Sequence, residues 1–129
     1  MATITASWTE NITAVDFDDT SPADTVAATA SIDLAADGYD CIVVQIKFTF
    51  HASAADYITI SVYADVNSGS SPDDIPIFSQ RVASIAGVSK EMSIVLQDLP
   101  FVDIVFLNDS QQEVTNLDLI YAGRKWASA

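Results

Sequence analysis

The chain has 129 residues, of which 50% are hydrophobic, so it is long enough for one domain with a buried core. Eighteen acidic residues face five basic ones, which gives a net charge of −13. This balance argues against nucleic acid as a partner, because phosphate binding requires a basic surface, and against anionic membrane surfaces.

The chain offers one cysteine and no targeting signal. Cys41 cannot form an internal disulfide, and it begins an apolar run, so we expect a buried or half-buried small side chain. Residues 1–15 lack the basic and apolar regions of a signal peptide, and no apolar run is long enough for a membrane helix. We therefore expect the chain to be made and folded in a cytoplasm.

The first third of the chain contains weaker candidates for strands. TITASW, residues 3–8, and NITAVDF, residues 11–17, are two short segments of this kind. Residues 26–34 alternate larger apolar side chains and alanines with small or polar ones, and an Asp37-Gly38 turn follows. The alanines are compatible with a helix, but the alternation and the turn favour a strand.

The strongest strand patterns lie in the middle of the chain. Residues 41–51 and 57–66 alternate apolar and polar side chains with a period of two, as half-buried strands do. The apolar side chains expected on the buried faces are Ile42, Val44, Ile46, Phe48 and Phe50 in the first segment, and Ile58, Ile60, Val62 and Ala64 in the second.

Four further segments complete the predicted strands. Pro76 cannot donate to a ladder, so the strand in residues 75–87 should lie at an edge or begin after Pro76. Residues 90–100 alternate again, and the nearly continuous apolar run at 101–109 predicts a central strand. Residues 113–126 should form the last strand, with Leu117, Leu119 and Tyr121 facing inward.

Seven to nine short strands without a convincing helix predict an all-β fold. We expect a two-sheet antiparallel sandwich, jelly-roll or immunoglobulin-like, because each strand has one apolar face to bury. Residues 1–24 would form an N-terminal arm or the first strands, and residues 25–129 the β-sandwich domain.

Two acidic segments are weak candidates for calcium. NSGSSPDD, residues 67–74, and DFDDTSPAD, residues 16–24, supply carboxylates, but neither has the ligand spacing of a calcium loop. Both are also explained as solvated loops, and we predict no metal site. The single histidine, His51, has no nucleophile motif to serve, so we predict no catalytic residue, no cofactor and no enzymatic activity.

The aromatic and basic residues near the two ends form the one candidate interface. Trp8 and Trp126 lie outside the strongest core strands, and Arg124 and Lys125 adjoin Trp126 as the only basic cluster. Trp and Arg are enriched where proteins meet, so these four residues are our interface prediction. Exposed tryptophans also serve as sugar-binding platforms, and a frayed C-terminal tail is the third explanation.

The layout of residues 25–126 resembles small β-sandwich virion proteins of tailed bacteriophages. The resemblance rests on SIDLAADGYDCIVVQIKFTF as a turn and long alternating strand, and on ISVYADVNSGSSPDDIPIFSQRV as a strand–loop–strand. It also rests on LQDLPFVDIVFLNDSQQEVTNLDLIYAGRKW, which ends in a basic-aromatic tail. None of these stretches is a catalytic motif.

This resemblance implies a head decoration (cement) protein on the capsid exterior, or else a neck, tail or fibre component. Its partners would be the major capsid protein and copies of itself, as a homotrimer, with neither nucleic acid nor membrane involved. The acidic composition agrees with a place away from packaged DNA. A carbohydrate-binding sandwich module, possibly calcium-dependent, is the alternative function.

Overall fold

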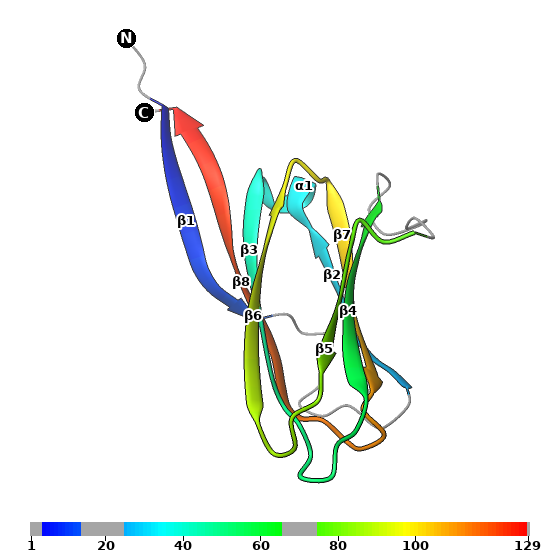
Figure 1. Ribbon diagram of the computed structural model, residues 1–129. Coiled ribbons are helices and arrows are strands. Elements are labelled where there is room, and N and C mark those ends of the chain that lie inside the picture. The colour runs from blue at the N-terminus through cyan, green and yellow to red at the C-terminus, as the bar shows by residue number, and fades with distance from the viewer. Residues whose placement is uncertain (1–3, 14–24, 66–74, 129) are drawn as a thin grey trace.

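A computed structural model describes residues 4–13, 25–65 and 75–128 of the chain, and almost all of them lie in strands (Figure 1). The elements are β1 (Ile4–Thr13), β2 (Thr25–Asp33), α1 (Leu34–Asp37), β3 (Cys41–Thr49), β4 (Tyr57–Asp65), β5 (Phe78–Ala83), β6 (Ser89–Gln97), β7 (Phe101–Asp109) and β8 (Thr115–Ser128). The predicted all-β class is confirmed.

Two four-stranded antiparallel sheets pack face to face, as the sequence predicted. One sheet has the order β1-β8-β3-β6 and the other β2-β7-β4-β5. The strands pair in a nested way, since β1 pairs with β8, β2 with β7, β3 with β6 and β4 with β5. This doubled-back winding of eight strands is the jelly-roll arrangement rather than the immunoglobulin one.

The core lies between the sheets and is built from the alternating strands. Phe48 contacts Phe50 and Phe106 edge-on, with ring centroids 5.2 and 5.3 Å apart, and all three side chains are buried. The predicted inward side chains of β3 and β4 are buried, except Ala64, which is half-buried. β7 lies between β2 and β4 as the predicted central strand, and β5 lies at an edge as Pro76 indicated.

Two local details differ from the sequence-based expectation. The alternation to Leu34 predicted strand, but β2 ends at Asp33, whose carboxylate accepts a hydrogen bond from the Ala36 N–H at 2.9 Å and begins the four-residue helix α1. Residues 3–8 and 11–17 were predicted as separate segments. The structure joins Ile4–Thr13 into one strand with a bulge, where Asn11 has φ 54°.

The predicted division of the chain at residue 24 stays a prediction. β1 pairs with β8 in the same sheet as β3, whereas residues 14–24 lie outside the described part of the chain. Among the described residues, no helix is long and apolar enough to span a membrane.

Candidate interface at the ribbon

The first residues of β1 and the last residues of β8 form a two-stranded ribbon. β3 pairs with β8 only as far as Arg124, whereas β1 pairs with β8 from Ile4↔Ser128 to Thr9↔Gly123. We call Ile4–Thr9 together with Gly123–Ser128 the ribbon. Its far end projects beyond the two packed sheets (Figure 1). Within the described chain, the ribbon therefore presents two faces, an edge of β1 that pairs with no other strand, and an edge of β8 that is unpaired beyond Arg124.

Three of the four predicted interface residues meet on one face of this ribbon. Trp8 lies directly across from Arg124, and Trp126 follows two positions along β8 on the same face. The Arg124 guanidinium carbon lies 5.7 Å from the Trp8 ring centroid and 5.3 Å from that of Trp126. Both indoles remain half exposed, at 46% and 54%. The arginine thus holds two large aromatic surfaces side by side by cation–π attraction.

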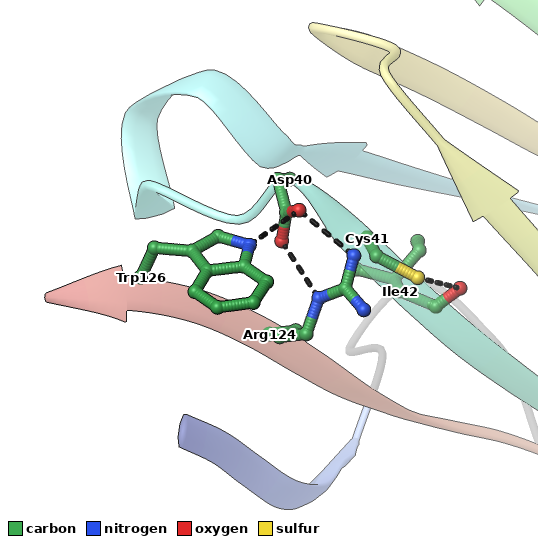
Figure 2. A network of polar contacts seen from close by, with 5 residues as sticks. All are labelled: Asp40, Cys41, Ile42, Arg124 and Trp126. Atoms are coloured by element: carbon green, nitrogen blue, oxygen red, sulfur yellow. Dashed lines mark hydrogen bonds and ion pairs between the residues drawn. The ribbon is translucent and has the colours of Figure 1, made fainter. Parts of the chain in front are cut away.

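Asp40, the residue directly before β3, fixes the positions of Arg124 and Trp126 (Figure 2). Arg124 donates from Nε to Oδ1 at 3.1 Å and from Nη2 to Oδ2 at 2.9 Å, and Trp126 donates from Nε1 to Oδ2 at 2.8 Å. The Asp40 backbone N–H also donates to the Arg124 carbonyl at 3.1 Å. Such a two-pronged arginine–carboxylate pair restricts orientation as well as position.

The pair shifts the titration of both of its members. The hydrogen bonds from Arg124 lower the pKa of Asp40 below its ordinary 3.8, with the Trp126 hydrogen bond acting in the same direction. Asp40 in turn raises the pKa of Arg124. The carboxylate and the guanidinium are therefore both charged throughout the neutral range.

Lys125, the fourth predicted interface residue, points to the other face. Its ammonium lies 5.1 Å from the centroid of the Tyr39 ring. The same ring covers Gly123 so closely that a Cβ there would come within 2.6 Å of three ring atoms. Tyr39 and Asp40 are consecutive residues, and they contact opposite faces of β8 at the base of the ribbon.

The described residues contain no cluster of metal ligands. No group of three or more His, Cys, Asp or Glu side chains within residues 4–13, 25–65 and 75–128 is arranged to hold a metal ion. His51 is exposed, and its Nδ1 accepts a hydrogen bond from the Ser53 N–H at 2.9 Å. Cys41 is buried, as predicted. The two candidate calcium segments, 16–24 and 67–74, lie outside the described residues.

The sequence analysis did not identify Asp40 or Tyr39 as parts of this site. Both follow the Asp37-Gly38 turn, and Gly38 takes the left-handed φ of 75° that the turn requires. Their partners are more than 80 positions later in the chain, so only the strand order brings them together. The lone basic pair beside Trp126 was the only signal that the sequence carried.

A second surface feature lies on the outer face of the sheet that contains β3, β6 and β8. It is a shallow hollow of about 500 Å³. Thr49 and Ser89 share a 2.8 Å hydrogen bond there, Asn116 donates to Thr49 at 3.3 Å, and Lys47 lies 3.9 Å from Glu91. Most of the residues that line the hollow carry hydroxyl, amide or charged groups, and Phe48 and Leu117 are the apolar ones.

Comparison with known proteins finds chains of similar fold but assigns this chain to no family. No protein-family model matches the sequence, and no curated protein matches it. The CBM22-1-GH10 modules of Clostridium thermocellum xylanase 10B, solved with xylohexaose, align at 13% identity and a TM-score of 0.55, over 90% of this chain and 28% of that chain. Latent PorU of Porphyromonas gingivalis aligns at 14% identity and a TM-score of 0.50, over 95% and 13%.

A virion protein is also among the similar structures. The vertex protein P5 of PRD1 aligns at 12% identity and a TM-score of 0.49, over 93% of this chain and 95% of that chain. At 13% and 14% identity, the likenesses to the xylanase modules and to PorU concern the fold alone and assign no function. This chain spans less than a third of the xylanase and PorU chains that it matches.

Proposed function

We propose that the chain is a structural protein of a virion, most specifically a decoration (cement) subunit that bridges capsomers on the outside of the head. The feature that carries the proposal is the projecting ribbon, on which Asp40, Arg124 and the two indoles form a held and half-exposed aromatic surface. Pre-organised Trp and Arg side chains are the residues that dominate binding energy at protein interfaces. A structural role is proposed in place of a catalytic one.

The proposed partners are the major capsid protein and further copies of this chain, as a homotrimer. Each contact of one ribbon is small, but repeated subunits on a capsid lattice convert weak contacts into lasting attachment. The net charge of −13 favours a location outside the packaged DNA. A neck, tail or fibre position would use the same surface for a different neighbour.

The test is to locate the chain on particles and then to remove the indoles. Gold-labelled antibody against the chain should bind the heads of virions made from the genome that encodes it. Trp126→Ala, and separately Trp8→Ala, should weaken binding to undecorated heads by about tenfold or more. Val95→Ala removes another exposed apolar side chain, 59% exposed on β6, and is the matched control. Unlabelled virions, or equal binding by all variants, would contradict the proposal.

Carbohydrate binding is the second candidate, and the polar hollow favours it. Hydroxyl, amide and carboxylate groups from Thr49, Asn116 and Glu91 converge there around a volume suited to one or two sugar rings. One of the similar structures is a xylanase whose CBM22-1-GH10 modules were solved with xylohexaose.

A glycan array separates this candidate from the first. A carbohydrate-binding module should retain defined oligosaccharides and lose them with Asn116→Ala, while Trp126→Ala has no effect. Thermal shifts measured with and without calcium would show whether the binding depends on the ion. Absence of retention on the whole array would remove this candidate.

A further inference from the structure

The four edge strands are β1 and β6 in one sheet and β2 and β5 in the other. They differ in the features that protect an edge against pairing with another strand. β5 has only six residues, carries Arg81 and follows Pro76. β6 carries Lys90 opposite the buried Phe48, so a lysine lies on the inward-facing side of that strand. Short length, proline and inward charges are the usual protections of an exposed edge. The edge of each sheet that ends in β5 or β6 is therefore protected against pairing with another strand.

β1 lacks each of these protections. It has ten residues with no Lys, Arg or Pro, and Glu10 is its only charged side chain. Residues 5–10 are all exposed, and β1 pairs only along its β8 side within the described chain. β2 has a similarly uncharged sequence, but it runs along the packed sheets, whereas the start of β1 stands clear of them (Figure 1). The unpaired backbone N–H and C=O groups along this edge can form hydrogen bonds with another strand.

We propose that β1 pairs antiparallel with β1 of a second copy of this chain. The pairing would join two four-stranded sheets into one sheet of eight strands about a two-fold axis. A two-fold axis makes a strand meet itself, and β1 tolerates this because it is long, rich in Thr, Ser and Ala, and nearly uncharged. This contact needs only a second copy, so it stands apart from the capsid partner and from the trimer contact proposed above.

Charge opposes contact less at this place than between the bodies of two copies. Arg124 and Lys125 give the ribbon a charge of +2, so the remaining residues carry −15 of a chain whose total is −13. Contact between two bodies would bring strongly acidic surfaces together. Contact at the projecting ribbons keeps the bodies apart, and screening beyond about 8–10 Å weakens what repulsion remains.

The pairing can be tested by cysteine cross-linking on the intact chain. Cys41 is 2% exposed and stays out of the reaction. Single variants Thr5→Cys, Ala6→Cys, Ser7→Cys and Thr9→Cys place a thiol along β1, and Ser79→Cys on β5 and Ser93→Cys on β6 are exposed controls on the other end strands. Light scattering after size exclusion should give an even multiple of the chain mass: twice that mass for the β1 pair alone, and six times where the pair joins two of the trimers proposed above. Mild oxidation should cross-link one or two β1 positions and neither control.

A lysine on the strand provides the second arm. Thr5→Lys, which lies opposite Ala127 on β8 rather than opposite Lys125, adds the positive charge that β1 lacks and should raise the dimer dissociation constant at least tenfold, while Ser93→Lys leaves it unchanged. Circular dichroism checks that both variants keep the β-spectrum. A monomeric wild-type chain, or a trimer without β1 cross-links, overturns the strand pairing and leaves the capsid proposal standing. A β1-linked dimer that fails to bind virions supports the pairing and contradicts the capsid proposal.

Discussion

The interior of the sandwich and the ribbon are held together by different forces. Between the sheets, aliphatic and aromatic side chains such as Phe48 and Phe106 are fully buried, and they owe their stability to apolar area removed from water. In the ribbon, Trp8 and Trp126 are half exposed, and one carboxylate and one guanidinium fix their positions. An isolated two-stranded ribbon is marginally stable in water, so its base must be tied to the larger sheets.

This difference teaches that the ribbon can respond locally while the sandwich responds as a whole. A defect in the core removes stability from every strand, because the strands share one cluster of side chains. Loss of the contacts that Tyr39 and Asp40 make with β8 should open only the ribbon. The three variants below test this contrast, in order of the expected effect.

Phe106→Ala should produce the largest loss. Phe106 is fully buried and contacts Phe48 edge-on, so truncation leaves a cavity and should lower the free energy of unfolding by about 3–5 kcal/mol. Urea denaturation followed by circular dichroism measures the change. Val105→Ala, on the outward side of the same strand, is the control and should cost clearly less. Equal losses for both variants would contradict a core concentrated between the sheets.

Gly123→Ala should have an intermediate effect, because the new methyl group would overlap the Tyr39 ring. Forced rearrangement of this kind costs about 1–3 kcal/mol. The same substitution made in a Tyr39→Ala background should cost close to nothing, since the overlapping ring is gone. This double-mutant cycle isolates the contact. A cost that persists without the ring would show that Gly123 is required for another reason.

Asp40→Asn should have the smallest effect on global stability and the clearest effect on the ribbon. It removes the charge that pairs with Arg124 and orients Trp126. Amide hydrogens of the ribbon should exchange faster, and tryptophan fluorescence should change, while urea unfolding of the sandwich stays nearly the same. Glu113→Gln changes another exposed carboxylate and should alter neither signal.

Acid should mimic the Asp40 substitution. Because Arg124 lowers the pKa of folded Asp40 below 3.8, the contribution of this pair is complete above that pH and is lost as the pH falls through the lowered value. Tryptophan fluorescence of the wild-type chain should therefore change as the pH falls below 3.8, before the circular dichroism does. The Asp40→Asn variant should lack this early step.

The sequence predicted the strands of the sandwich because their periodicity reflects burial directly. Ile58, Ile60 and Val62 alternate with polar residues since one side of β4 faces the core, and the structure confirms this. The pairing of strands left no such trace, because any two alternating strands can lie side by side. Jelly-roll topology could therefore not be separated from immunoglobulin topology before the strand order was known.

The ribbon was predicted only in part, for the same reason. Trp8, Arg124 and Trp126 attracted attention as isolated residue types, and the structure brings them together. Asp40 was missed because a lone acid after a turn is common in a chain with eighteen acids. Whether this group is an interface stays a prediction, as do the capsid partner and the oligomer.

The nested pairing of the strands also sets an order of assembly for the chain. β4 and β5 are neighbours in sequence, so their pairing closes the smallest loop, whereas β1 and β8 come from the two ends of the described chain. Once an inner pair has formed, the next pair outward closes a shorter free loop, and its formation costs less conformational entropy. We therefore expect folding to advance from the middle of the chain outward. The pairing of β1 with β8 should then form last and open first.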